Sequence, residues 1–243
     1  MKKKSVQLKW IFAFAFCTAI GSFPAFSQEQ NNKKDAVKEA SAATQPGADQ
    51  EKQAAEWVSS LNLNDPAKEA RLKAVIATHL TAIRDWNNDH PFTTVPAGIN
   101  PESGKKLSDL DRQIIANSAI PKSVHENLMA GLRKDLNEEQ VEAILDKYTI
   151  GKVAFTLNGY KAIVPDLTEK EEKVIVDNLK QAREQAVDFK NMKQVSAIFE
   201  IYKTKNEQYL NANGRNWHQL FGDYVKAAKA KKAAEKQASK TNP

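Results

Sequence analysis

The sequence predicts an all-α protein, an antiparallel array of about six to eight helices joined by short connections. Three observations indicate this fold class. Apolar residues recur at spacings of three and four in several long segments, which places them on one face of a helix. Helix-start motifs precede four of these segments. Only one segment, residues 153–164, has an alternation typical of a β-hairpin.

The first 27 residues have the layout of a secretory signal peptide. Lysines at 2–4 precede an apolar run over 10–20, and small residues follow at Ala25 and Ser27. The run is shorter than the roughly 20 residues that span a bilayer. We therefore expect a periplasmic or secreted protein with no stable membrane anchor. Cys17 would leave with the signal, so the mature chain would form no internal disulfide.

Composition divides the rest of the chain into three parts. Residues 28–50 are polar and predict a disordered tether, because they bury too little apolar surface to fold. A single helical domain is expected over 51–228, followed by a lysine-rich tail over 229–243 that frays as a solvated helix end. The net charge of +6 falls to +2 without the four lysines of the signal peptide. The folded body then lacks the basic patch of a nucleic-acid binder, so we expect no nucleic-acid partner.

The first long helix is predicted from about residue 67. Asp65 before Pro66 is a typical helix start, and His90-Pro91 is a typical end. Between them one stripe of side chains has spacings of 4, 3, 4, 3 and 4: Leu72, Ile76, His79, Ile83, Trp86 and His90. The proline- and glycine-rich segment 92–106 is predicted to be a long loop.

Four capping boxes predict the starts of further helices. In each, Ser, Asn or Thr is followed three positions later by an acidic residue or Gln, so that both side chains satisfy backbone amides. The pairs are Ser108 and Asp111, Ser123 and Glu126, Asn137 and Gln140, and Thr168 and Glu171. We interpret these acidic residues as helix starts and not as catalytic groups, because the helix dipole stabilises them there.

Residues 153–164 fit two secondary structures. Asn158-Gly159 predicts a hairpin turn, yet a lone hairpin is marginally stable. Phe155, Gly159, Tyr160 and Ile163 also fit helical spacing, so the balance favours a helix or irregular structure, with a short hairpin as the alternative.

The C-terminal half predicts three more helices. After Thr168 one face carries Ile175, Leu179, Ala182, Ala186 and Phe189, and the next apolar stripe runs from Val195 to Leu210. Gly214 is a natural break, and the last helix is expected from Trp217.

No catalytic signature is present. The sequence has no Gly-x-Ser-x-Gly, no His-Glu-x-x-His and no phosphate-binding glycine loop, so we expect no cofactor and no metal. Two groups of residues could instead hold a polar ligand, since aromatic faces with amides and charged groups are typical of sugar sites. The first group is His79, Arg84, Asp85, Trp86 and His90; the second is Asn213, Arg215, Trp217 and His218.

Each group also has a purely structural interpretation. His79 could be a hydrogen-bonded core residue, and Arg84 and Asp85 a surface ion pair beside a buried Trp86. The asparagine-rich turn could simply tolerate left-handed backbone, with Trp217 packed inward.

A set of residues in the C-terminal half is similar to one known family. It comprises Leu167-Thr168-Glu169, Ala182-Arg183-Glu184, Ala186, Asp188, Phe199, Tyr202-Lys203, Asn206, Tyr209-Leu210 and Gly214, with His79 to Asp85 upstream. These residues resemble an uncharacterised family of exported helical proteins from Bacteroidetes, often encoded beside polysaccharide-degrading enzymes and sometimes labelled as sugar-binding. The resemblance implies a role in glycan use and assigns no active-site residue.

Three hypotheses follow. The leading one is an exported, non-enzymatic protein that binds an oligosaccharide in polysaccharide utilisation. Its Leu-Thr-x-x-Glu helix start also resembles small periplasmic stress chaperones, which makes a chaperone-like helical protein the alternative. A second alternative is a carbohydrate-active enzyme that uses His79, Arg84 and Asp85. The first predicts a preformed concave site, the second an extended apolar groove, and the third a convergence of these side chains in a cleft.

Overall fold

The computed structural model describes residues 47–101 and 103–241. The predicted signal peptide and most of the predicted tether lie outside the described residues. Residues 44–225 make up one compact unit, of which the structure describes 47–101 and 103–225. The second unit comprises residues 1–43 and 226–243, of which the structure describes 226–241.

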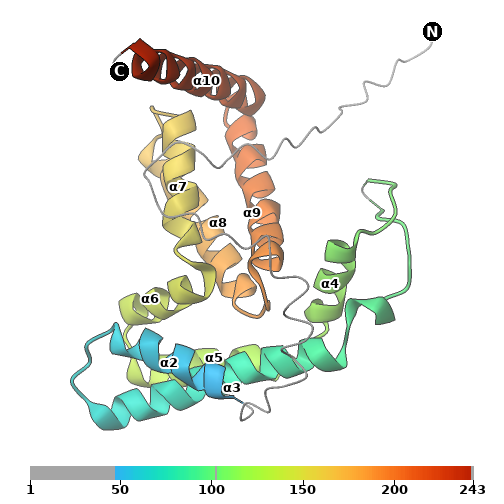
Figure 1. Ribbon diagram of the computed structural model, residues 1–243, viewed down its shortest axis with the longest axis vertical. Coiled ribbons are helices and arrows are strands. Elements are labelled where there is room, and N and C mark those ends of the chain that lie inside the picture. Colours follow the sequence, from blue (N-terminus) through green and yellow to red (C-terminus); the bar gives the residue numbers. More distant parts are fainter. Residues whose placement is uncertain (1–46, 102, 242–243) are drawn as a thin grey trace. The chain divides into compact units, whose positions relative to one another are not determined.

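Nine α-helices occupy the described residues, which confirms the all-α prediction and exceeds its upper count by one (Figure 1). They are α2 (Ala48–Ser59), α3 (Pro66–Asp89), α4 (Asp109–Ser118), α5 (Lys122–Asp135), α6 (Glu138–Thr149), α7 (Lys152–Ile163), α8 (Glu169–Ala186), α9 (Met192–Ala212) and α10 (Trp217–Thr241). Helix α2 begins at Ala48, so the last residues assigned to the tether are its first turn. The loop after α3 holds a 3₁₀ turn, Phe92–Thr94, and a single antiparallel bridge between Ile99 and Lys106.

The predicted start of α3 and three of the four capping boxes are confirmed. Asp65 accepts a hydrogen bond from the Lys68 amide at 3.0 Å, and both halves of the box are present at Ser108, Asn137 and Thr168. These side chains fix where α3, α4, α6 and α8 begin.

The fourth capping box, Ser123 with Glu126, is wrong. Helix α5 begins at Lys122, two residues before the start that a Ser123 cap would give, and Ser123 lies inside its first turn. The Pro121 carbonyl already accepts the Val124 amide at 3.0 Å. Pro121 has its φ fixed at −57° by its ring, which favours an immediate helix start without a side-chain cap.

Residues 152–163 form helix α7, so the helical interpretation is confirmed and the hairpin alternative is wrong. The helix buries Val153, Tyr160 and Ile163. Ile150 and Gly151 precede it in left-handed conformations, with φ of 52° and 63°, and this pair turns the chain from α6 into α7.

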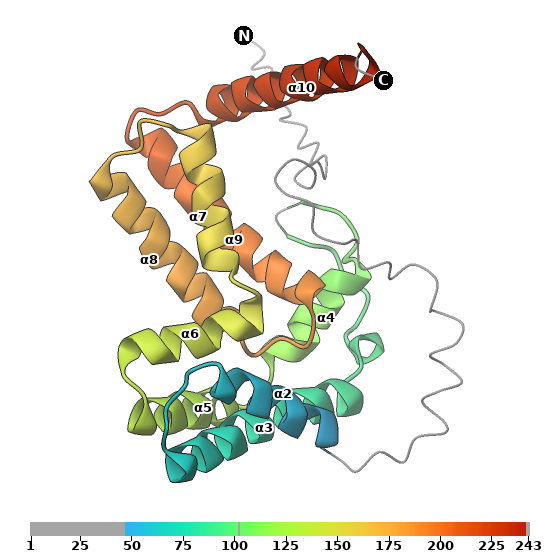
Figure 2. The same ribbon diagram turned by 60° about the vertical axis from the view of Figure 1, so that its left-hand side comes forward.

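The unit of residues 44–225 contains two apolar cores. The first core is built mainly on α2, α3, α5 and α6, and includes Val58, Leu72, Ile76, Leu128, Leu132 and Ile144. The second core is built mainly on α7, α8 and α9, and includes Tyr160, Ile175, Leu179, Ile198, Phe199 and Leu210. Figures 1 and 2 show α7, α8 and α9 grouped together, with α2, α3 and α5 crossing beyond one end of them.

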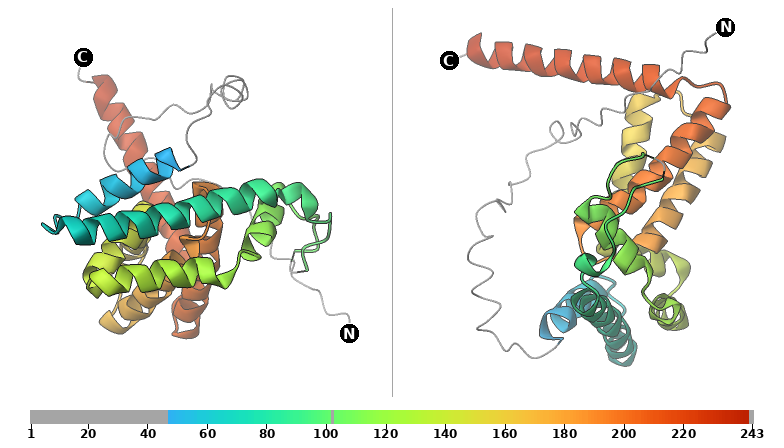
Figure 3. Two further views of the ribbon diagram at one scale, coloured as in Figure 1. Left: turned by 90° about the horizontal axis from the view of Figure 1, so that it is seen from below. Right: turned by 90° about the vertical axis from the view of Figure 1, so that its right-hand side faces the viewer.

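Helices α3 and α5 pack closely side by side (Figure 3). A Cβ atom at Gly131 of α5 would lie 2.7 Å from the methyl carbons of Val75 on α3. Glycine therefore permits the short approach that holds α5 against α3.

Helix α10 continues beyond the first unit to Thr241. Residues 226–234 are exposed. None of the helices in the described ranges has the length and apolar character needed to cross a membrane.

Candidate functional site

The first predicted group of site residues does not form one site. His79 is 3% exposed and lies in the core. Its Nδ1 lies 3.1 Å from the Tyr148 hydroxyl and its Nε2 lies 2.9 Å from Asp188 Oδ1. The structure therefore matches the alternative of a hydrogen-bonded core histidine.

The remaining residues of the first group contact one another, α2 or α4. Arg84 pairs with exposed Asp85 at 2.7 Å and also donates to Gln50. Trp86 donates its indole N–H to the Ala116 carbonyl, and its ring stacks on His90 with 3.7 Å between centroids. His79, Arg84 and Asp85, which the enzyme hypothesis required to converge in one cleft, therefore do not converge.

The second predicted group lies beside a small surface pocket near the C-terminal end of α9. The pocket has a volume of about 470 Å³, and Asn213 and Arg215 line it. Arg215 is bound by Glu171 and Asp166, while Trp217 packs against the second core, 5.1 Å from the Tyr160 ring. His218 is exposed. Figures 1 and 2 place this turn and α3 at opposite ends of the unit.

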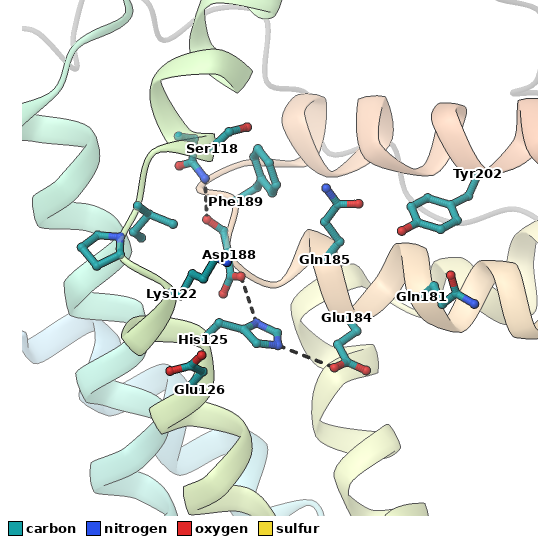
Figure 4. A pocket seen from close by; sticks show the side chains of 13 residues that line it. Ser118, Lys122, His125, Glu126, Gln181, Glu184, Gln185, Asp188, Phe189 and Tyr202 are labelled. Atoms are coloured by element: carbon teal, nitrogen blue, oxygen red, sulfur yellow. Dashed lines mark hydrogen bonds and ion pairs between the residues drawn. The ribbon is translucent and has the colours of Figure 1, made fainter.

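A larger cleft, of about 610 Å³, lies between α5 and α8, and we call it the α5–α8 cleft. Its polar lining comes chiefly from these two helices: Lys122, His125 and Glu126 from α5, and Gln181, Glu184 and Gln185 from α8. The rings of Phe189 and Tyr202 complete the lining (Figure 4). The cleft therefore combines side-chain amides, charged groups and aromatic faces.

The helix periodicity explains why these side chains face the cleft. On α5 the buried residues Leu128, Met129 and Leu132 point toward the first core. His125 lies three and four positions before the first two of them, so it extends the same stripe at the helix start. On α8, Gln181 and Gln185 are four residues apart and therefore share one face.

Asp188 connects the cleft to the interior. Its Oδ2 accepts a hydrogen bond from His125 Nδ1 at 2.9 Å, and its Oδ1 accepts one from His79 Nε2 at 2.9 Å. The Asp188 carbonyl accepts the Asn117 amide at 2.7 Å, and Asn117 is 1% exposed. Asp188 is thus held from three helices.

The hydrogen bonds fix the tautomers. An ionised carboxylate only accepts, so both imidazoles donate to Asp188. Neutral His79 then accepts from the Tyr148 hydroxyl through Nδ1. His125 has Nδ1 committed to Asp188, and its Nε2 lies 3.6 Å from Glu184 Oε1 at the cleft.

The same hydrogen bonds shift the pKa values of the residues that they link. The hydrogen bond to Asp188 raises the pKa of His125 above its ordinary value, against the opposing effect of burial, and Glu184 adds to the rise. Burial alone would raise the pKa of Asp188, but the hydrogen bonds from His125 and His79 outweigh it and lower that pKa. Burial, with the nearby Asp188 charge, raises the pKa of Tyr148 well above its usual range.

Sequence reasoning missed His125 as a site residue and gave Asp188 and Glu184 no chemical role. A usable signal was the position of His125 on the stripe of Leu128 and Leu132, where a polar residue at a core-facing position invites a partner. Asp188, between buried Val187 and Phe189, carries the same signal. Among the described residues no three His, Cys, Asp or Glu side chains form a metal site.

A family profile matches most of the chain. The profile of a family described as "Protein of unknown function (DUF3826)" matches residues 48–230. No curated protein matches the chain.

Proposed function

We propose that the chain, which belongs to the DUF3826 family of proteins of unknown function, binds an oligosaccharide in the α5–α8 cleft. The observation that carries this proposal is the lining of the cleft. Sugar hydroxyls need convergent donors and acceptors, and the apolar faces of sugar rings need aromatic surface. The cleft offers both in about 610 Å³, a volume within the range of small-molecule sites.

The two glutamines of α8 are the side chains best suited to bind sugar hydroxyls. Gln181 and Gln185 are exposed and line the cleft. Neither side chain forms a hydrogen bond within the described residues, so each side-chain amide is available as both donor and acceptor. Glu126 and Glu184 add acceptors beside them.

The wider setting of this function rests on sequence. A signal-peptide layout, together with the resemblance to exported Bacteroidetes proteins encoded near polysaccharide-degrading enzymes, supports a periplasmic or secreted glycan-binding protein. The proposed ligand is then an oligosaccharide released from a cell-wall polysaccharide.

The chaperone alternative receives less support. Large exposed apolar residues of the described chain lie on different elements: Ile99, Ile115, Ile150, Phe155, Ile201 and Phe221. These six residues therefore do not line up as a continuous apolar stripe that could hold an unfolded client protein.

Titration calorimetry of the protein with cell-wall oligosaccharides tests the proposal. We expect saturable binding that the double variant Gln181→Ala/Gln185→Ala weakens by roughly tenfold or more, since each lost hydrogen bond costs about 0.5–1.5 kcal/mol. The matched control is Gln208→Ala, an exposed glutamine of α9 that does not line the cleft. Equal binding by all three proteins would place the sugar elsewhere, and no binding to any glycan would exclude the function.

A further inference from the structure

We propose that the α5–α8 cleft is also a hydrolytic site, in which His125 transfers the proton and the substrate is an ester carried by a sugar. This rests on the proposed function, because the cleft must hold the sugar before it can hydrolyse an ester on it. Binding alone needs no oriented imidazole. The chain of hydrogen bonds that ends on His125 is what the binding proposal leaves unused.

The geometry is that of an oriented general base. The three side chains are linked by hydrogen bonds in the order His79, Asp188, His125. Their exposure rises in that order, from 1% to 15% to 26%. Asp188 fixes Nδ1 of His125 at 2.9 Å and thereby directs Nε2 toward the cleft (Figure 4). A carboxylate that orients the far nitrogen of a catalytic imidazole is the arrangement used in acyl transfer.

His79 acts here as a positioning residue. It holds the second oxygen of Asp188 at 2.9 Å and is itself held by the Tyr148 hydroxyl. The Asn117 amide holds the Asp188 carbonyl. Because the carboxylate has no freedom to rotate, the His125 ring is fixed before any substrate enters, which lowers the cost of reaching the reactive geometry.

The nucleophile assigned by these contacts is water. Among the described residues, no hydroxyl or thiol forms a hydrogen bond with His125 Nε2. Ser118 lines the same cleft, but its hydroxyl donates to the Ile114 carbonyl at 2.7 Å. A water that enters between Nε2 and a bound ester can be activated directly.

An ester fits the cleft better than a glycosidic bond does. Glycoside hydrolysis uses two carboxyl groups that face each other across the bond. Here Asp188 accepts from Nδ1 of His125 and Glu184 lies 3.6 Å from Nε2. Of the three acids that line the cleft, only Glu126 is then not paired with the imidazole, so no two free carboxyl groups are left to face each other. Ester hydrolysis needs one group that first takes and then returns a proton.

The reaction balances with water as the only co-reactant. Water loses a proton to Nε2 of His125 as its oxygen bonds to the carbonyl carbon of the ester. The bond between that carbon and the sugar oxygen then breaks, and Nε2 returns the proton to the sugar oxygen. Glu184 stabilises the intermediate imidazolium, and the ammonium of Lys122, which lines the cleft, offers a cation to the developing oxyanion.

The test is acetate release from acetylated xylo-oligosaccharides, followed by NMR, with p-nitrophenyl acetate as a non-sugar ester. We expect His125→Gln to lower kcat/KM by about 10²–10⁴-fold, the usual contribution of a general base. His218→Gln, an exposed histidine outside the cleft, is expected to retain full activity. Circular dichroism establishes that both variants are folded.

The pH profile provides a test that does not depend on the folding of His125→Gln. Neutral His125 is the active form, so kcat/KM should fall as the pH drops through the raised pKa of His125. The titratable groups near this histidine are Glu184 of α8, Asp188 in the segment after α8 and, on the far side of Asp188, His79 of α3. Lys122 and Glu126 of its own helix line the same cleft. Asp188→Asn should lower the rate and move the acidic limb to lower pH, because it removes the charge that raises that pKa. A merely structural role for Asp188 would not move the limb.

Five results decide between this proposal, the binding proposal and neither. Sugar binding without acetate release would overturn the hydrolytic proposal and leave the binding proposal standing. If the protein neither binds a glycan nor releases acetate, both proposals are wrong. Hydrolysis of p-nitrophenyl acetate alone overturns the sugar ester as substrate. A rate that is unchanged in folded His125→Gln, or that is constant between about pH 5 and pH 9, overturns the role of His125.

Discussion

At the scale of single residues, Ile150 adopts a conformation that its side chain disfavours. It caps α6 with φ 52° and ψ 47°, a left-handed region that costs a β-branched residue roughly 1–2 kcal/mol. The side chain is 71% exposed, so it contributes little burial in return. Ile150→Gly should therefore raise the free energy of unfolding by about 1 kcal/mol, as measured by urea denaturation.

The matched control for Ile150→Gly is Ile201→Gly. Ile201 is also exposed, at 49%, but lies inside α9. Glycine in a helix interior lowers stability by about 0.5–1 kcal/mol, so the same substitution should have opposite signs at the two positions. A loss of stability at both would show that Ile150 is not strained.

The residue scale is also where the sequence was least informative. The stripe on α3 predicts that His79 faces the core, and it does. Its partner Asp188 lies 109 positions away along the chain. Periodicity predicts a face but not the element opposite it, so neither the bond between these residues nor the role of His125 could be read from the sequence.

At the scale of elements, the start of α8 is held by more than its capping box. Arg215, from the turn before α10, donates to both Glu171 oxygens at 2.9 Å and to Asp166 at 2.7 Å. These bonds from Arg215, helped by those from Thr168, lower the pKa of Glu171 to about 2. The acid is therefore a helix start, as predicted, and also the anchor of a turn 44 residues further on.

Arg215→Gln should lower the free energy of unfolding by about 2–3 kcal/mol, because it removes hydrogen bonds between charged groups from a largely buried carboxylate. The contribution of Glu171 is present above its unfolded pKa of 4.5 and is lost as pH falls toward 2. The difference between wild type and variant should therefore shrink when unfolding is measured at decreasing pH.

The control for Arg215→Gln is Arg133→Gln. Arg133 forms a solvent-exposed pair with Glu138, at 3.5 Å, and such pairs contribute little. We expect a change within about 0.5 kcal/mol and no such pH dependence. If both variants lose the same stability, the turn is not anchored by Arg215.

Helices themselves were the most predictable elements, because their information is local. The caps at Asp65, Ser108, Asn137 and Thr168 and the stripes behind them lie within single segments of sequence. The error at Ser123 has the same origin, since a capping-box pattern two residues after a proline competes with the helix start that proline itself favours. The α5–α8 cleft could not be predicted, because its two walls are separated in sequence and no local pattern pairs them.

At the scale of the whole unit, residues 44–225, Asp188 lies where the two cores meet. Its neighbour Val187 packs in the first core and Phe189 packs in the second. His79 and His125, from helices of the first core, bind its carboxylate. The side chain therefore joins two apolar cores by polar bonds that neither core could supply by burial.

This junction predicts how the unit unfolds. Trp57 packs against the first core and Trp217 against the second, so single-tryptophan proteins, with the other tryptophans replaced by Phe, report each core by fluorescence. Both should unfold at the same urea concentration. Asp188→Ala should lower stability by about 2–4 kcal/mol and separate the two midpoints, because the cores lose the charge that couples them.

Asp135→Ala distinguishes coupling from a general loss of stability. Asp135 is also a largely buried acid, paired with Arg71 at 2.7 Å, but both residues belong to helices of the first core. Its removal should lower stability while the Trp57 and Trp217 curves stay superimposed. Superimposed curves in Asp188→Ala would mean that apolar packing alone couples the cores. Separated curves would show that the residues that orient His125 at the cleft also make the two cores one cooperative unit.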